Sequence, residues 1–245
     1  MKIDHILIRV DNLQNAVSDF EDLGFKVYYG SNKKTCHHAM IYFRDGSFLE
    51  LIDQTKFPGI FTFLAKMGIL NLFGVVFKRF AHYCVSKERF LDYSILAEDI
   101  DAFYQRSKDK SPSKLMEMKR KNHSDEVVKW KLFAFDNLTL PFVMSEYVPY
   151  RMPDKEAFIH KNGVLSISQI EICVKDTEKH INDFQNCFGI SSFSEDTIEM
   201  VDSKITLEAS EHHRIKSVTL LSEKVDDNLK ARLANYHIKL VENES

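Results

Sequence analysis

The chain has 245 residues and a formal net charge of -3, with 44% hydrophobic and 28% charged residues. This is the composition of a soluble globular protein, and its charge balance gives no electrostatic basis for binding nucleic acid or an anionic membrane. The first residues carry acidic side chains where a secretory signal would need a long apolar run, so we expect a cytoplasmic protein. The four cysteines are scattered and form no CxxC pair, which predicts free thiols and excludes a zinc finger.

Residues 1–54 have the pattern of a strand, a helix and three further strands. Apolar and polar side chains alternate over residues 3–10, which predicts a strand with His5 and Arg9 on one face and Asp4 on the other. Apolar residues then recur at helical spacing between an asparagine N-cap and a glycine stop. The segment therefore predicts one βαβββ unit.

The last two strands of this unit flank the sequence Arg-Asp-Gly-Ser. Asp45 and Gly46 are a strong signal for a two-residue hairpin turn, which would place Ile41 opposite Glu50. A carboxylate in the otherwise apolar strand FLELI is costly to bury without a partner. We therefore expect Glu50 and His5 to be a functional pair.

An apolar insert at residues 55–90 breaks the pattern. Residues 58–77 are about as long as a membrane span and carry Lys66 as their single charge. Three glycines and an asparagine in this run, and its place between two soluble-looking units, disfavour a transmembrane helix. The alternatives are short helices packed on the sheet, an apolar lid or homodimer surface, and a docking surface for a partner or membrane.

Residues 91–150 predict a second unit, and residues 166–245 a third one after an irregular linker at 151–165. The third unit repeats the opening of the chain. A constant offset pairs Ile8 with Ile172, and it likewise pairs apolar positions of the following helix. Such agreement at structurally meaningful positions predicts related units rather than chance similarity.

Repeated βαβββ units resemble the vicinal oxygen chelate superfamily, which includes glyoxalases and extradiol dioxygenases. The segments DHILIRVDNL, DGSFLELI, VVKWKLFAF and LPFVMSEY look most like its glyoxalase-like branch. The resemblance implies an α+β fold in which paired modules form curled mixed sheets around a cavity. It also implies a divalent metal held by side chains from the first and last strands of each module.

Within that resemblance, His5 matches the ligand on the first strand and Glu50 the ligand on the last strand of the first module. An imidazole with a carboxylate suits iron, manganese, zinc or nickel, and Glu50 could also accept a proton in catalysis. In the second module Asp92 takes the position of His5, as a ligand or as a solvated residue at a strand start. Met144 or Glu146 takes the position of Glu50. The expected metal set is therefore His5, Glu50, Asp92 and Glu146.

The third unit departs further from the pattern of the superfamily. Gln169 falls opposite His5, and Leu207 or Glu208 falls opposite Glu50. Because glutamine is a poor ligand for transition metals, we expect no complete metal site there.

Four further residues are candidates for binding a substrate: Arg9, His37, Arg120 and Trp130. His37 shares the face of Glu50 by alternation, at the cavity mouth or in an exposed loop, whereas His38 is expected to face away. The two arginines could anchor an anionic group. Trp130 packs in the core or lines the cavity.

The leading hypothesis is a metal-dependent lyase, isomerase or dioxygenase that acts on a small, partly apolar molecule between the modules. The alternative is a metal-free protein of the same fold that binds or sequesters such a molecule. The incomplete ligand set and the 19 phenylalanines make this alternative a serious one, because binding pockets are mostly apolar with few polar groups.

Overall fold

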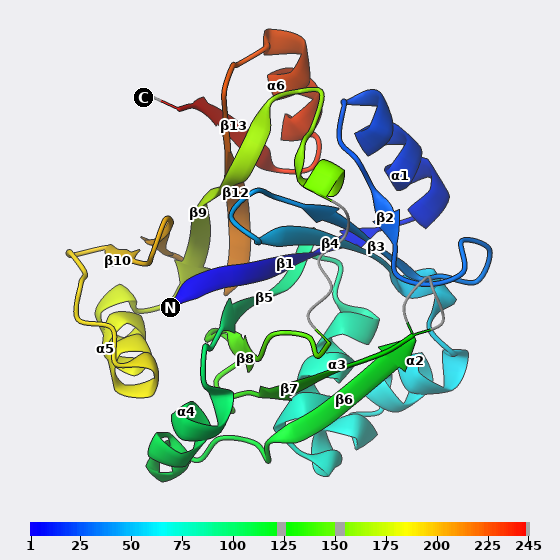
Figure 1. Cartoon of the computed structure of the whole chain (residues 1–245). Coiled ribbons are helices and arrows are strands. Elements are labelled where there is room, and N and C mark those ends of the chain that lie inside the picture. Colours follow the sequence, from blue (N-terminus) through cyan, green and yellow to red (C-terminus); the bar gives the residue numbers. More distant parts are fainter. Residues whose placement is uncertain (122–125, 150–154, 244–245) are drawn as a thin grey trace.

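The computed structural model describes residues 1–121, 126–149 and 155–243, so residues 151–154 of the expected linker lie outside the described residues. The described strands form two mixed sheets, one of eight and one of five strands (Figure 1). The larger sheet curls, and helices pack against both sheets. The expected α+β fold of curled mixed sheets is confirmed.

The first module opens the larger sheet. Its elements are β1 (Lys2–Val10), α1 (Leu13–Asp22), β2 (Tyr28–Tyr29), β3 (His38–Tyr42) and β4 (Phe48–Asp53). Asn12 caps α1 because its side-chain oxygen accepts a hydrogen bond from the backbone N–H of Asn15 at 2.9 Å. The apolar stripe of α1 is buried against the sheet, as the helical spacing of its residues predicts.

The hairpin between β3 and β4 differs by one residue from the expected register. Tyr42 pairs with Phe48 and Met40 with Glu50, so Met40 takes the place that alternation gives to Ile41. The reason is a three-residue loop in place of a two-residue turn, in which Gly46 adopts a φ of 85°. A slip of one residue moves every side chain of a strand to the other face, so the prediction for Ile41 was wrong.

The insert consists of short helical pieces: η1 (Gln54–Lys56), α2 (Gly59–Lys66), η2 (Ile69–Phe73) and α3 (Val75–Val85). Gly68 and Gly74 have φ values of 72° and 101°, and these left-handed turns divide the apolar run. Within the part of the chain that the structure describes, no helix is long and apolar enough to cross a membrane. The apolar run is thus folded back on itself and packed beside the sheet.

The second module completes the larger sheet. Its elements are β5 (Phe90–Leu96), α4 (Ile100–Arg106), η3 (Lys108–Lys110), β6 (Met116–Lys121), β7 (Val127–Phe133) and β8 (Phe142–Met144). β5 pairs antiparallel with β1, which joins the modules in the order β2-β3-β4-β1-β5-β8-β7-β6. The first strands of the two modules therefore lie side by side at the centre of the sheet.

The C-terminal half forms the smaller sheet. Its elements are η4 (Lys155–Phe158), β9 (Val164–Val174), α5 (Thr177–Phe188), β10 (Thr197–Glu199), β11 (Lys204–Ala209), β12 (Arg214–Ser222), α6 (Asp227–Ala234) and β13 (Ile238–Glu242). β11 runs parallel to β9 as β4 does to β1, and β13 runs parallel to β12 as β8 does to β5. This half is therefore built from two shortened units that pair as the full modules do.

Apolar side chains form separate clusters on the two faces of the larger sheet. Ile6, Ile8 and Leu51 face a continuous core that includes α1 and residues of the smaller sheet. Leu7 and Ile52 face a smaller cluster on the other side. Helix α1 and the second sheet thus cover one face, and helix α3 of the insert and the pocket described below lie on the other.

Candidate functional site

A cavity of about 410 Å³ lies between the two modules and helix α3. Its wall is largely apolar and includes Phe80, Met116, Met118, Trp130, Leu132 and Phe142. His5 and Glu50 lie in the same wall, so the expected pair faces an apolar pocket. A concave, mostly apolar site with a few polar groups is the usual form of a small-molecule site.

His5 is held by contacts on both sides of its ring. Its Nδ1 lies 2.6 Å from Oδ2 of Asp4 and 2.7 Å from Oγ of Ser94. The ring stacks on Phe48 with a centroid distance of 4.5 Å. These contacts leave Nε2 as the ring nitrogen that approaches Glu50, at 3.6 Å from its Oε2.

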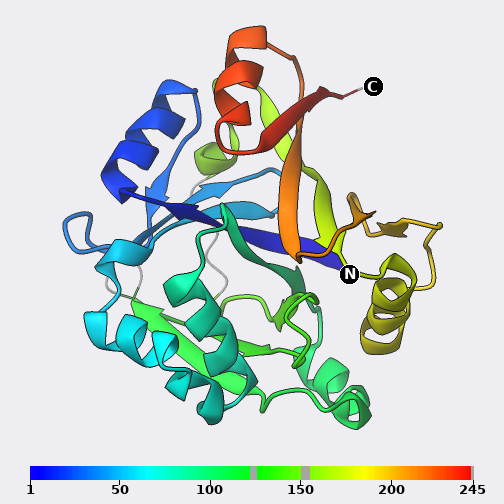
Figure 2. The ribbon, with the colours of Figure 1, turned by 180° about the vertical axis from the view of Figure 1, so that it is seen from behind.

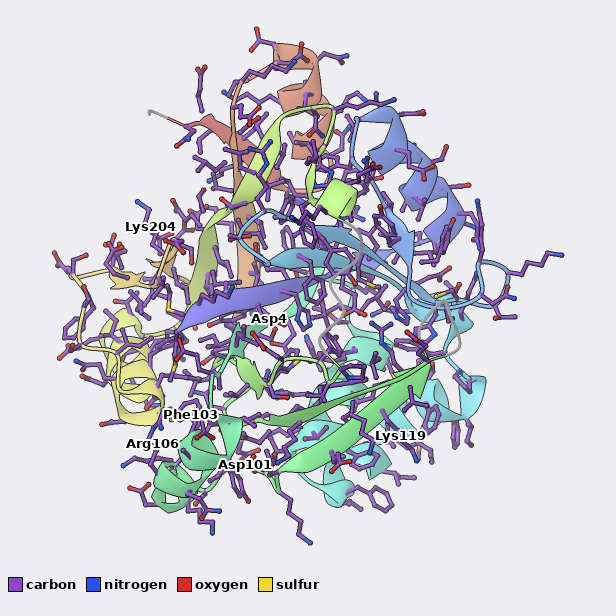
Figure 3. The ribbon with its side chains drawn as sticks, in the orientation of Figure 1. Asp4, Asp101, Phe103, Arg106, Lys119 and Lys204 are labelled. Atoms are coloured by element: carbon purple, nitrogen blue, oxygen red, sulfur yellow. The ribbon has the colours of Figure 1, made fainter. Side chains whose placement is uncertain are left out.

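Asp4 reaches His5 because β1 carries a bulge. The pairing of β1 with β5 shifts between Ile3 and His5, so Asp4 is the extra residue. Bulges redirect side chains next to functional sites, and Asp4 lies on β1 near the centre of the molecule (Figure 3). Simple alternation places Asp4 on the face opposite His5, and the sequence contains no signal for the bulge.

The pKa of His5 is raised above 6.5. Burial lowers this pKa. The hydrogen bond and negative charge of Asp4, with a smaller contribution from Glu50, raise the pKa by more than burial lowers it. The imidazole therefore keeps its proton to a higher pH than an exposed histidine. The site thus has an imidazole between two carboxylates, and His5 and Glu50 lie in the largely apolar wall of the cavity.

Asp92 is engaged away from His5 and Glu50. Arg79 of α3 places Nη1 2.6 Å from Oδ2 of Asp92, and Tyr83 donates a hydrogen bond to the same oxygen. Arg79 also donates to the backbone carbonyls of Asn137 and Leu140. Because Arg79 and Asp92 are both buried, this ion pair fixes α3 to the sheet.

Glu146, the last member of the expected metal set, does not reach the pocket either. Met144 lines the cavity, whereas Glu146 is exposed to solvent. Among the described residues, no group of three or more His, Cys, Asp and Glu side chains is placed to hold a metal ion. Such a metal is usually bound by three or four side chains. The structure thus supplies one half of a metal site, and this donor set does not fit an ion held by protein side chains alone.

Arg120 and two histidines bring polar groups to another part of the cavity wall. Nη1 of Arg120 lies 3.0 Å from Nε2 of His38 and 3.2 Å from the carbonyl oxygen of Gly30. His37 also lines the cavity, and its ring packs against Phe57. His38 therefore faces the pocket, contrary to expectation, because of the register shift in the hairpin.

The two other candidate substrate residues are placed differently. Trp130 lines the cavity and its ring lies 5.2 Å from that of Tyr147. Arg9 is bound at the end of β1 by Asp11, with 2.7 Å between Nη1 and Oδ1. Arg120 thus lines the pocket, whereas Arg9 lies outside the cavity wall.

Cys36 is a further residue beside the site that motif reading does not identify. Its buried thiol contacts Nδ1 of His38 at 3.9 Å. Burial raises the pKa of this thiol, but hydrogen bonds from His38 and Ser31 outweigh that effect and lower the pKa to about 6. His38 is thus contacted by Cys36 on one side and by Arg120 on the other.

We expect Gly30→Ala to distort this corner and to lower the free energy of unfolding by about 1–3 kcal/mol, the usual cost of overpacking. A Cβ at Gly30 would lie 1.8 Å from Nε2 of His38. Urea denaturation measures the effect. Gly59→Ala is the matched control, because its added Cβ meets no described atom within 4 Å. Equal stability of the two variants would contradict the tight contact with His38.

The C-terminal half replaces the His–Glu pair with a neutral contact. In the same register as His5 and Glu50, Nε2 of Gln169 donates to Oγ1 of Thr206 at 2.8 Å. Thr206, rather than Leu207 or Glu208, therefore corresponds to Glu50. The ionisable pair occurs in the first module and not in its C-terminal counterpart.

Paired βαβββ units that curl around a pocket, with a histidine on the first strand and a glutamate on the last, define a protein of the glyoxalase-like class. The chain belongs to the family of the glyoxalase-like domain, whose sequence model matches residues 3–188. It is thereby a member of the vicinal oxygen chelate superfamily. A search of curated proteins finds no match.

Solved structures share this fold. A hypothetical protein from Staphylococcus aureus superposes with a TM-score of 0.68 and 18% identity, covering 91% of this chain and 92% of that chain. The Mn(II)-bound glyoxalase from Novosphingobium aromaticivorans superposes with a TM-score of 0.55 and 11% identity, covering 97% of this chain and 71% of that chain. The 2,2',3-trihydroxybiphenyl 1,2-dioxygenase from Sphingomonas wittichii strain RW1 has a TM-score of 0.52 and 12% identity, and the match covers 97% of this chain and 79% of that chain. At these identities the likeness concerns the fold alone.

Proposed function

We propose that the chain is an enzyme that binds a small molecule with an apolar body and an anionic end, and that it moves a proton on this molecule. The observation that carries the proposal is the His5–Glu50 pair in the wall of a largely apolar cavity, with Asp4 bound to the other ring nitrogen of His5. Ionisable groups are costly to keep in such surroundings, and they gather where chemistry uses them.

The pocket suits a substrate of this description. Its volume of about 410 Å³ falls within the usual range for small-molecule sites. The methionine and aromatic side chains of β6, β7 and β8 would contact the apolar body. Arg120 would bind a carboxylate or a similar group through charge-assisted hydrogen bonds.

The proposed chemistry is general acid–base catalysis at a carbon next to a carbonyl group. Glu50 would take the proton, because its carboxylate lies in the cavity wall and is partly exposed. His5 would stabilise the developing negative charge or return the proton from Nε2, while Asp4 holds its Nδ1. This places the enzyme among isomerases or lyases rather than oxygenases.

A metal-dependent reaction is the second candidate, because Nε2 of His5 and Oε2 of Glu50 lie 3.6 Å apart with Nδ1 held by a carboxylate. Metal-binding histidines are commonly oriented in this way. A divalent ion at these two residues would supply Lewis acid chemistry. Among the described residues His5 and Glu50 are the two side chains that would hold the ion, so other ligands would have to come from the substrate or from water.

The test uses 2-oxo-4-phenylbutanoate, which combines an aromatic body, a carboxylate and an acidic C–H group. We expect the protein to accelerate exchange of that hydrogen in D₂O, measured by NMR, and Glu50→Gln to slow it by about 10²–10⁴-fold. Arg120→Gln should weaken binding by about tenfold, read from the fluorescence of Trp130, the single tryptophan. Arg44→Gln, which alters an exposed ion pair with Glu223, is the control.

The outcomes separate the candidates. Exchange in the presence of a chelator supports proton transfer by the side chains alone. Exchange that requires added Mn²⁺ or Zn²⁺ overturns this and supports the metal-dependent reaction. If neither condition gives exchange and Glu50→Gln binds the molecule as the wild type does, the proposed enzyme activity is wrong and the chain is a binding protein.

A further inference from the structure

The insert between the modules exposes an unusual number of large apolar side chains. Met67, Leu72 and Phe73 are 62%, 83% and 64% exposed, and Leu72 is the most exposed large hydrophobic side chain among the described residues. Other members of this insert surface are Ile60, Phe61, Phe63 and Phe77. Every residue of α2 keeps some exposure to solvent, so this helix does not contribute a face to the core. These side chains come from α2, η2 and α3, which pack on one another, and exposed apolar side chains gathered in this way are typical of an interaction site.

The insert surface also carries a positive charge, that of Lys66. The sequence contains no aspartate or glutamate between Asp53 and Glu88, but it contains four lysines and an arginine. Arg79 is buried against Asp92, and Lys78 pairs with Asp136 at 2.9 Å. Lys66 is exposed at the end of α2, among the apolar side chains. The whole chain has a charge of -3, so this basic region stands against the overall balance.

The position of the insert links this surface to the pocket. In both views the cyan helices and β6 lie at one end of the molecule, and β13 and α6 lie at the other (Figures 1 and 2). Lys119 of β6 lies at the same end as the insert (Figure 3). Phe77 of α3 is 40% exposed and also lines the cavity. The cavity therefore reaches the insert surface at this side chain.

We propose that the insert surface docks on the interface of an anionic lipid bilayer and that the pocket takes its substrate from that bilayer. Exposed aromatic and aliphatic side chains would enter the boundary between headgroups and acyl chains, and Lys66 would contact the anionic headgroups. The short helices lie in this boundary and do not cross the membrane. The docking is thus peripheral and reversible.

Charge decides between a bilayer and a second copy of the chain. A two-fold contact places the same surface of both copies together. Here it would bring together two copies of a surface that carries the positive charge of Lys66, and residues 54–87 contain no acidic side chain to offset it. An anionic lipid surface offers the complementary charge as well as an apolar layer, so it fits both properties of the insert surface.

The second part of the inference rests on the proposed function and narrows its substrate class. A molecule that enters through Phe77 from a bilayer must partition into lipid, and its anionic end would remain near the headgroups. The pocket has two corresponding parts: apolar walls for the lipid-soluble body, and Arg120 for the anionic end. The substrate is therefore an amphipathic, lipid-soluble carbonyl compound.

The docking test is sedimentation of the protein with vesicles of phosphatidylcholine, with and without phosphatidylglycerol, and with no substrate. We expect binding to the anionic vesicles, weakened about tenfold or more in Leu72→Ser/Phe73→Ser and in Lys66→Glu. Added salt should reduce binding of the wild type. Val201→Ser/Val241→Ser is the matched control, because it removes two exposed apolar side chains from the C-terminal half. Absence of wild-type binding to the anionic vesicles would overturn the proposal.

Two further measurements make the result specific. If analytical ultracentrifugation shows a dimer that Leu72→Ser/Phe73→Ser dissociates, the surface is covered by a second copy and the proposal is wrong. For delivery from the bilayer, we expect the same variant to slow proton exchange in a long-chain 2-oxo acid carried by vesicles, but not in 2-oxo-4-phenylbutanoate in solution. Equal exchange rates of the wild type and the variant on the vesicle-borne substrate would show that the pocket does not take its substrate from the bilayer. Vesicle binding without any exchange would overturn the proposed function and leave the docking in place.

Discussion

Replacing Arg79 with methionine is expected to lower the free energy of unfolding by about 3–5 kcal/mol, because it leaves Asp92 buried without its cation. Both side chains are at most 6% exposed, so water cannot replace the lost contact. The change also removes donors to the carbonyls of Asn137 and Leu140. Urea denaturation followed by circular dichroism measures the loss.

A matched control lies one residue away. Lys78→Met breaks the ion pair with Asp136, whose side chain is 70% exposed, and such surface pairs contribute only about 0–1 kcal/mol. Adding Asp92→Asn to Arg79→Met should recover part of the loss, because the buried charge is removed as well. If Arg79→Met costs no more than Lys78→Met, α3 is not held in place by this ion pair.

The second large effect is expected from Asp4→Asn. This change removes the main group that raises the pKa of His5, so the pKa should fall. A pKa raised above its unfolded value of 6.5 adds stability that is complete below pH 6.5 and is lost as the pH rises through the folded pKa. Asp4→Asn should therefore cost about 1.5–3 kcal/mol at pH values below about 6.5 and less in alkaline solution.

NMR titration of His5 and urea denaturation over a pH series measure these two effects. Glu50→Gln is the comparison, because its carboxylate is 3.6 Å from the ring and that of Asp4 is 2.6 Å away. We expect Glu50→Gln to lower the pKa of His5 by less than Asp4→Asn does. A stability loss from Asp4→Asn that is the same at every pH would show that the charge on His5 does not contribute.

Local patterns were sufficient to predict helices α1 and α5. Asn12 and Asp176 cap α1 and α5 in equivalent positions, each accepting a hydrogen bond from the backbone three residues later. Capping, helical spacing and strand alternation depend on neighbours in the sequence, so they can be read without the fold. The pairing of His5 with Glu50 followed from the same patterns once the resemblance to known modules was recognised.

The hairpin shows how one local feature limits such a prediction. An Asp-Gly pair is compatible with both a two-residue and a three-residue loop, and these differ by one residue in register. In the structure Gly46 takes the left-handed position of the longer loop. His38 and Met40, rather than Ile41, therefore share the face of Glu50.

The sequence by itself determined the strands and helices of the modules, and the His5–Glu50 pair on neighbouring strands of one unit. Only the tertiary structure decided what faces that pair, because Asp92 is engaged by Arg79 and Tyr83 from an insert whose packing no periodicity describes. The bulge that turns Asp4 toward His5 depends on pairing with β5, about ninety residues away in the chain. Contacts between distant segments are set by packing and burial across the whole chain, and these are absent from any local pattern of residues.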